Sequence, residues 1–259
     1  MNISITTIQS DLYWENKKAN LDMFSSLIKK VPKESKIVVL PEMFTTGFST
    51  TPKNLAESME GESVKWMLKQ AIISNKNIVG SLIIKEDNTF FNRLIVAQPN
   101  EELFYYDKRH LFRYADEHLN YEGGNDQLIL NIEGVKFAFF VCYDLRFPVW
   151  SRNIKLKYDA AIYIANWPEK RRDHWITLLK ARAIENQAFI VGVNRIGCDG
   201  KGISHSGDSM VFNPMGKKIS TTHPNESIVE TTKLNLELLN NYRAKFPAYL
   251  DVDDFTIHP

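Results

Sequence analysis

The sequence of 259 residues has little cysteine, no long apolar run and no excess of charge of either sign. Its two cysteines, Cys142 and Cys198, are too few for a disulfide framework and too far apart for a zinc-binding pair, which fits a reducing compartment. No stretch approaches the ~18 consecutive apolar residues of a membrane-spanning helix. With a net charge of +1, the chain has no global field that would draw it to nucleic acid or to an anionic membrane. We therefore expect a small-molecule partner, with no nucleic acid and no membrane.

Signals for targeting and for metal binding are also absent. The first residues, Met-Asn-Ile-Ser-Ile-Thr, contain no basic leader, no apolar signal segment and no cleavage site. His110, His118 and His174 are scattered and lack the His-x-x-x-His spacing of a metal site. The sequence therefore predicts a cytoplasmic protein that uses neither a metal nor another cofactor.

Nothing in the composition divides the chain. We find no linker rich in Ser, Gly or Pro, no low-complexity tract and no repeat with a period of about 20–50 residues. With 44% hydrophobic and 24% charged residues, the chain can bury a sizeable core. We predict one domain that spans residues 1–259.

Short apolar runs rich in β-branched residues alternate with helical patterns along the chain. Apolar side chains at three-to-four spacing predict helices around 21–31, 64–72 and 175–182. Turn signals at 86–88, 133–134 and 214–216 indicate hairpins, so that parts of the sheet are antiparallel. The alternation favours an α/β fold with mixed sheets. The predicted strands are 3–8, 37–40, 78–84, 94–97, 103–106, 135–141, 160–165, 189–193 and 210–212.

Unusual polar residues follow four of these strands. In α/β sheets, loops at the carboxyl ends of the strands carry functional side chains into one crevice. Each residue alone has a plainer explanation, since a lone Cys is usually a small buried side chain and a Glu or Lys is usually solvated. Their shared position favours one pocket that holds a thiol, a base and a cation. The residues are Glu42, Lys108, Cys142 and the pair Asn166-Trp167.

A free thiol needs assistance to act as a nucleophile at neutral pH. Its pKa lies near ~8.5, so that only a few per cent is thiolate. A carboxylate beside Cys142 raises the pKa of the thiol and an ammonium group lowers it, so that Glu42, Lys108 and Cys142 would titrate as one coupled set. Such coupling suits proton transfer during acyl transfer.

Three ordered motifs carry a resemblance to a known family. They are the segments 41–44 (Pro-Glu-Met-Phe), 106–112 (Tyr-Asp-Lys-Arg-His-Leu-Phe) and 141–148 (Val-Cys-Tyr-Asp-Leu-Arg-Phe-Pro). In their order and spacing they resemble the Glu, Lys and Cys motifs of the nitrilase superfamily of carbon–nitrogen hydrolases. The resemblance continues through 181–187, 194–197 and 207–216 and so spans nearly the whole chain. It implies a four-layer αββα sandwich, usually paired into homodimers.

The resemblance also implies catalytic roles and a reaction through a cysteinyl thioester. A second glutamate of the family matches Glu117, which lies a few residues before the turn Gly123-Gly124, and Glu122 is the competing assignment. The implied roles are those of general base for Glu42, oxyanion partner for Lys108, nucleophile for Cys142 and further oxyanion donor for the backbone N–H of Tyr143.

Within the superfamily, the motifs at 108–112, 116–118, 166–168 and 245–248 look most like those of bacterial ω-amidases. Those enzymes hydrolyse the terminal amide of 2-oxoglutaramate or 2-oxosuccinamate, so that a pocket with aromatic walls and an arginine for the distal carboxylate is expected. We expect the basic cluster of Lys170, Arg171 and Arg172 to be the charged start of a helix. The candidate walls are Phe44, Phe112, Tyr114 and Trp167, and the candidate arginines are Arg113, Arg146 and Arg172.

Alternatives remain open at this point. Arg146 lies near Asp144 and is alternatively half of a buried structural pair. Other reactions of the superfamily are the hydrolysis of nitriles, aliphatic amides or N-carbamoyl amino acids. A catalytically idle binding protein would keep the fold, but such proteins commonly lose a catalytic residue, and here every position is filled.

Overall fold

Two β-sheets form the centre of the protein in a computed structural model, which describes residues 2–257. Met1, His258 and Pro259 lie outside the described residues, and with them the extreme ends of the domain predicted for residues 1–259. The first sheet has the order β13 (Ile228–Asn235), β1 (Asn2–Gln9), β2 (Ser35–Val39), β3 (Asn77–Glu86), β4 (Thr89–Ala97) and β5 (Leu103–Asp107). The second has the order β12 (Met210–Phe212), β9 (Phe189–Asn194), β8 (Ala160–Ala165), β7 (Val135–Val141) and β6 (Leu128–Ile132).

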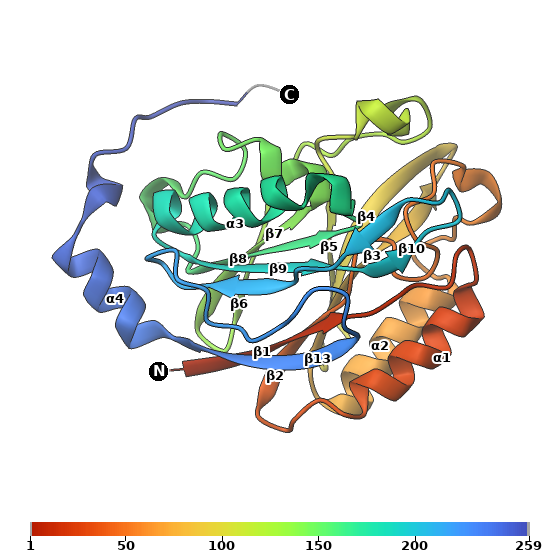
Figure 1. Cartoon of the computed structure of the whole chain (residues 1–259), viewed down its shortest axis with the longest axis horizontal. Helices are drawn as coiled ribbons and strands as arrows, with labels where there is room; N and C mark the ends of the chain where they lie inside the picture. The colour runs from red at the N-terminus through yellow and green to blue at the C-terminus, as the bar shows by residue number, and fades with distance from the viewer. Residues whose placement is uncertain (1, 258–259) are drawn as a thin grey trace.

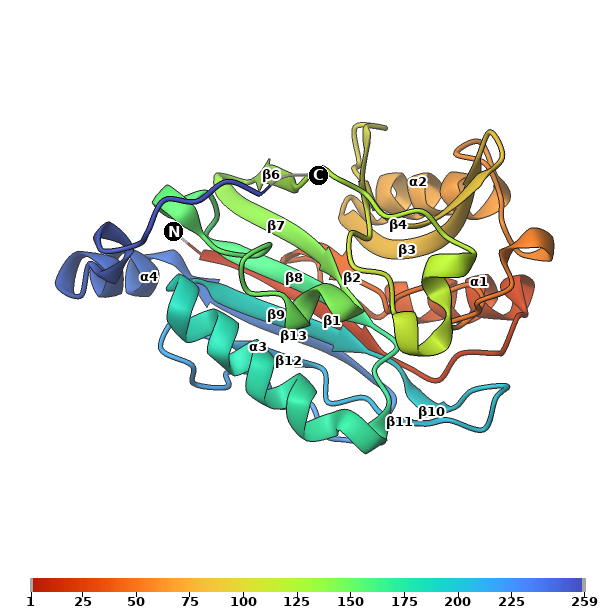
Figure 2. The same cartoon turned by 90° about the horizontal axis from the view of Figure 1, so that it is seen from above.

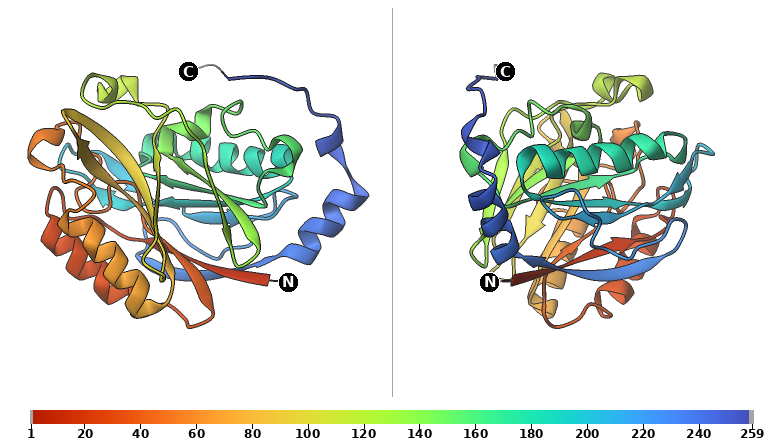
Figure 3. Two further views of the ribbon diagram at one scale, coloured as in Figure 1. Left: turned by 180° about the vertical axis from the view of Figure 1, so that it is seen from behind. Right: turned by 60° about the vertical axis from the view of Figure 1, so that its left-hand side comes forward.

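Helices cover the outer faces of both sheets (Figure 1). The helices α1 (Lys17–Ile28) and α2 (Glu62–Ser74) lie together on one side of the molecule, and α3 (Arg172–Asn186) lies on the other (Figures 2 and 3). The helix α4 (Leu236–Lys245) follows β13 at one end. A small hairpin of β10 (Ile196–Cys198) and β11 (Ser204–Ser206) lies beyond the second sheet. The short 3-10 helices are η1 (Pro52–Asn54), η2 (Arg113–Ala115), η3 (Glu117–Leu119), η4 (Cys142–Arg146), η5 (Ile154–Leu156), η6 (Glu169–Arg171) and η7 (Ala248–Leu250).

Alternating side chains of the strands build the layers. In β2, Ile37 and Val39 point to the core between the two sheets, whereas Val38 packs in the separate core beneath α1 and α2. Successive side chains of a strand point to opposite faces, so that one buried strand can serve both cores. Because both faces of the central strands are buried, they read as unbroken apolar runs. The predicted αββα sandwich with mixed sheets is confirmed.

All nine predicted strands and all three predicted helices form, and the turns at 86–88 and 133–134 join the antiparallel pairs β3–β4 and β6–β7. Five further elements were not predicted from the sequence, namely β6, β10, β11, β13 and α4. The strand β13 contains Glu230, Thr231, Thr232 and Lys233, and its pairing with the buried strand β1 sets its conformation. A strand that depends on such pairing has no strong apolar pattern of its own.

Candidate active site

Three charged side chains meet at the carboxyl ends of β2 and β5, and all three are completely buried. The ammonium group of Lys108 donates to Glu42 Oε1 at 3.0 Å and to Glu117 Oε1 and Oε2 at 3.0 and 2.9 Å. Glu42 comes three residues after β2, Lys108 directly follows β5, and Glu117 begins η3. None of the three exposes any surface to solvent. The competing residue Glu122 is exposed, so that the structure brings Glu117 into the cluster and leaves Glu122 outside it.

The buried cluster keeps its charges because opposite charges are paired. Burial alone would lower the pKa of Lys108, but the negative charges of Glu117 and Glu42 outweigh burial and raise that pKa. Burial raises the pKa of Glu117, and the charge of Lys108 opposes this shift. Lys108 is therefore held as an ammonium ion between two carboxyl groups.

Polar neighbours fix the orientation of Glu42. Asn92 Nδ2 donates to Glu42 Oε1 at 2.8 Å, and the backbone N–H of Asn166 donates to Oε2 at 2.8 Å. The side-chain amide of Asn166 also donates to the backbone carbonyl of Glu42. Since Asn92 lies on β4 and Asn166 directly follows β8, strands of both sheets hold this carboxylate. These hydrogen bonds hold the Glu42 side chain in one rotamer, between the two sheets.

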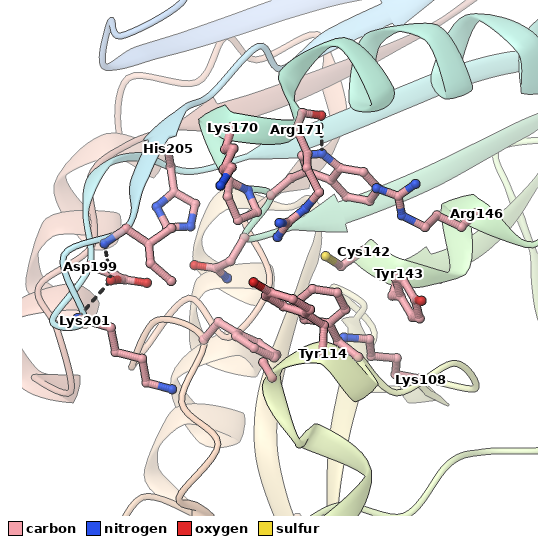
Figure 4. A pocket seen from close by; sticks show the side chains of 17 residues that line it. Lys108, Tyr114, Cys142, Tyr143, Arg146, Lys170, Arg171, Asp199, Lys201 and His205 are labelled. Atoms are coloured by element: carbon pink, nitrogen blue, oxygen red, sulfur yellow. Dashed lines mark hydrogen bonds between the residues drawn. The ribbon is translucent and has the colours of Figure 1, made fainter.

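Cys142 begins η4 directly after β7, with a left-handed backbone φ of 45°. Its side chain is partly exposed and lines the same pocket as Lys108 (Figure 4). Burial of the sulfur raises the pKa of the thiol, the charge of Glu42 raises it further, and the charge of Lys108 opposes both. The Cys142 thiol is therefore protonated near neutral pH. Such a thiol must lose its proton to a base before or during nucleophilic attack.

The pocket above Cys142 has a volume of about 280 Å³ and joins aromatic walls to cationic side chains (Figure 4). Of the predicted pocket residues, Phe112, Tyr114, Tyr143, Arg146 and Trp167 line it. Asn166, which was predicted to follow a strand at the site, lines it as well. The remaining lining residues are Phe48, Lys108, Ala115, Cys142, Pro168, Lys170, Arg171, Asp199, Lys201, Ile203 and His205.

Two arginines that were predicted to bind the substrate carboxylate, Arg172 and Arg113, do not line the pocket. Arg172 begins α3 and forms a two-point ion pair with Asp208, with distances of 2.7 and 2.8 Å, outside the pocket lining. Arg113 lies on η2, is exposed and is not part of the pocket lining. Along a short helical segment, adjacent residues point in different directions, which sequence position alone does not reveal.

The prediction that Phe44 forms a pocket wall was also wrong. Its ring is fully buried in the core beneath α1 and α2, at 5.5 Å from the ring of Phe24 and 5.6 Å from that of Trp66. Glu42 and Phe44 are only two residues apart, but Met43 between them has a left-handed φ of 44°. This turn directs Glu42 to the site and Phe44 to the core.

Arg146 is not the structural partner of Asp144, which was the alternative that the sequence left open. Asp144 is completely buried and bonds to Tyr106 and His110 instead. Arg146 donates to His174 Nδ1 at 2.9 Å, and its guanidinium carbon lies 4.9 Å from the centre of the Trp167 ring. Its charge therefore remains available at the pocket.

Several cationic or basic residues of the pocket were not predicted from the sequence. Arg171 was grouped with a charged helix start, yet its guanidinium carbon lies 5.3 Å from the ring centre of Phe112 and 5.8 Å from that of Tyr114. Lys201 reaches the pocket from the loop between β10 and β11. His205 is buried, and burial lowers its pKa to about 4, so that its ring is neutral near neutral pH. The proximity of residues 170–171 to the Asn166-Trp167 motif was the available signal.

No group of three or more His, Cys, Asp or Glu side chains within residues 2–257 is arranged to hold a metal ion. Over the same range, no helix is long and apolar enough to span a bilayer. The absence of a cofactor remains a prediction.

Comparison with known proteins places this site in a family. A model of the carbon–nitrogen hydrolase family matches residues 3–244. The chain belongs to that family, whose members include the nitrilase-type amidases that the sequence motifs resemble.

Several relatives are similar over almost their entire length. The omega-amidase YafV of Escherichia coli strain K12 is 43% identical over 257 residues, which cover 98% of both chains. The 2-oxoglutaramate amidase of Bacillus subtilis is 31% identical over 258 residues, which cover 97% of this chain and 98% of that one. A solved structure of XC1258 from Xanthomonas campestris, a CN-hydrolase superfamily protein, superimposes with a TM-score of 0.97 at 39% identity and covers 100% of both chains.

Proposed function

We propose that this protein hydrolyses the terminal amide of a small 2-oxo dicarboxylic acid monoamide, such as 2-oxoglutaramate or 2-oxosuccinamate, to the 2-oxo acid and ammonia. The observation that carries the proposal is one pocket that is lined by the Cys142 thiol, by Lys108 of a buried Glu-Lys-Glu cluster and by cations without an ion-pair partner among the described residues. The thiol and cluster suit acyl transfer, and the cations suit an anionic substrate. The names of the E. coli and B. subtilis relatives support the same substrate class.

In the first half of the proposed reaction, Glu42 accepts the proton of Cys142 as the sulfur attacks the amide carbon. The carbonyl oxygen becomes negatively charged, and Lys108 Nζ and the backbone N–H of Tyr143 stabilise it. Glu42 then gives its proton to the amide nitrogen. The carbon–nitrogen bond breaks, ammonia leaves, and the acyl group remains on the sulfur as a thioester.

Water completes the reaction by the reverse use of the same groups. Glu42 accepts a proton from a water molecule as the water oxygen attacks the thioester carbon. Lys108 again faces the negative charge that develops on the carbonyl oxygen. The carbon–sulfur bond then breaks, the carboxylic acid leaves, and the thiol regains its proton. Glu117 holds Lys108 in place through two hydrogen bonds, at 3.0 and 2.9 Å.

Charge at the pocket favours a substrate with a carboxylate. Within the described chain, no ion pair neutralises Arg146, Lys170, Arg171 or Lys201, all of which line the pocket. Among the described residues that line the pocket, Asp199 is the one acidic residue. Its Oδ1 accepts hydrogen bonds from the backbone N–H groups of Lys201 and Ile203. A guanidinium group binds a carboxylate through two parallel hydrogen bonds. We therefore propose Arg146 and Arg171 as the carboxylate-binding residues, in place of Arg113 and Arg172.

A substrate panel tests this function. We expect kcat/KM for 2-oxoglutaramate or 2-oxosuccinamate to exceed that for butyramide, a neutral nitrile and N-carbamoyl-β-alanine by about 10–100-fold or more. Butyramide and the nitrile have no carboxylate to pair with the partly buried guanidinium groups of Arg146 and Arg171, and N-carbamoyl-β-alanine lacks the 2-oxo group. Ammonia release measures all five. Arg146→Met and Arg171→Met should reduce this preference, whereas Arg113→Met, a matched variant outside the pocket, should keep it. A higher kcat/KM for butyramide, the nitrile or the carbamoyl compound would remove the ω-amidase assignment and leave the Glu–Lys–Cys mechanism standing.

We also propose that the protein is a cytoplasmic homodimer of single-domain chains. Exposed apolar side chains near α3 support the dimer, since Val149 is 56%, Ile184 46% and Met215 46% exposed. Such side chains are commonly covered at a protein interface. Light scattering at micromolar concentration should give the mass of two chains, and a strict monomer would contradict the dimer.

A further inference from the structure

The buried carboxylate of Asp144 joins the segment that carries Lys108 to the turn that carries Cys142. Asp144 lies two residues after Cys142, and it is completely buried. Its Oδ2 accepts the Tyr106 hydroxyl at 2.7 Å and the backbone N–H of Val141 at 3.0 Å. Its Oδ1 accepts the backbone N–H and the ring Nδ1 of His110 at 3.0 and 2.8 Å.

These four hydrogen bonds flank both candidate catalytic residues. Val141 directly precedes Cys142, whereas Tyr106 and His110 lie two residues before and two residues after Lys108. The strands β5 and β7 that carry these segments belong to different sheets. Asp144 therefore fixes the ends of the two strands relative to each other.

Tyr106 and His110 are themselves held by aromatic neighbours. The Tyr106 hydroxyl accepts Trp150 Nε1 at 2.9 Å, in addition to donating to Asp144. The His110 ring stacks on Phe147 with ring centres 3.8 Å apart and planes 6° apart. The acceptor oxygens of Asp144 thus face donors that have little freedom to move.

We infer that Asp144 is a positioning residue, whose buried hydrogen bonds hold the left-handed turn at Cys142 in line with Lys108 and Glu42. This inference rests on the catalytic roles proposed for those three residues. The left-handed φ of 45° at Cys142 costs energy for a residue with a side chain and persists only where surrounding contacts impose it. The hydrogen bond from Val141 N to Asp144 Oδ2 spans this turn and supplies such a contact.

The variant Asp144→Asn tests the inference, because its amide group presents a donor to neighbours that are themselves donors. We expect kcat to fall at least about 30-fold while KM stays within about threefold, since misplacement of reacting groups by about 1 Å can cost 10²-fold in rate. Alkylation of Cys142 by iodoacetamide, measured without any substrate present, should shift to lower pH as the loosened turn admits water. The reason is that burial is the largest cause of the raised pKa of this thiol.

A pair of tyrosine variants separates positioning from general stability. Tyr106→Phe and Tyr158→Phe each remove a buried hydroxyl, which donates to Asp144 in one case and to the carbonyl of Ser151 in the other. Both should lower the melting temperature. Tyr106→Phe should also lower kcat about tenfold, whereas Tyr158→Phe should leave kcat and the alkylation profile unchanged.

Three results would overturn the inference. These are a kcat of Asp144→Asn within threefold of the wild type, an effect on KM alone, or equal kcat losses in the two tyrosine variants. If Asp144→Asn does not fold, the tyrosine pair decides. A Cys142→Ala variant that retained turnover would instead refute the proposed mechanism, so that the two failures are distinguishable.

Discussion

Replacement of Cys142 by alanine is expected to abolish amide hydrolysis, by at least about 10⁴-fold, and to leave the fold intact. Without the sulfur no thioester can form, and the remaining groups can only polarise the amide. The replacement removes one atom from a side chain at the pocket, so that the free energy of unfolding should change by about 1 kcal/mol or less. Ammonia release and thermal unfolding measure the two effects.

Mass spectrometry supplies an independent measurement of the same step. The intact wild-type protein, quenched with acid during turnover, should carry an acyl group, and the Cys142→Ala protein should carry none. Cys198, the other cysteine, is exposed and free, and Cys198→Ala serves as the matched control with unchanged turnover. Turnover that survives in Cys142→Ala, or an adduct that persists in it, would rule out Cys142 as the nucleophile.

Replacement of Glu42 by glutamine is expected to lower kcat by about 10²–10⁴-fold while making the thiol more acidic. The negative charge of Glu42 raises the pKa of Cys142, so that its removal lowers this pKa and increases the thiolate fraction at a given pH. Alkylation by iodoacetamide should therefore shift to lower pH. A more ionised nucleophile with less activity would identify Glu42 as the proton acceptor.

The variant Lys108→Met provides the opposite test of the same electrostatics. The positive charge of Lys108 lowers the pKa of Cys142, so that its removal should shift alkylation to higher pH. Loss of an oxyanion donor should lower kcat by about 10²–10³-fold. Shifts of the same sign in both variants would contradict the proposed charges, and a loss below about tenfold in either would contradict its catalytic role.

Three of the candidate catalytic residues, Glu42, Lys108 and Cys142, were predictable from the sequence because each follows a strand that is easy to recognise. Buried central strands such as β2 and β7 are continuous apolar runs, and the loops that follow such runs face the crevice. Cys142 directly follows β7, and Glu42 lies in the loop three residues after β2. Glu117 does not follow a strand, and the family resemblance alone placed it ahead of Glu122.

The walls of the pocket were less predictable, because loops and short helical turns decide which neighbour faces the cavity. Arg171 and Arg172 are adjacent, yet one lines the pocket and the other pairs with Asp208. That partner lies 36 residues further along the chain, and nothing in the local sequence identifies it. Lys201 and His205 were not predicted for the same reason, since the hairpin of β10 and β11 brings them to the pocket.

The chain divides its candidate chemistry between two halves that follow each other in sequence. Glu42, Lys108 and Glu117 come before residue 120 and belong to the first sheet and its loops, whereas Cys142 and Asn166 come later and extend from the second. A fragment that ended between η3 and β6 would thus contain a base without a nucleophile, and the complementary fragment a nucleophile without a base. The strand β13 then returns to pair with β1, so that the last strand of the chain completes the sheet that the first strand began. The proposed hydrolysis therefore requires both sheets in their docked arrangement.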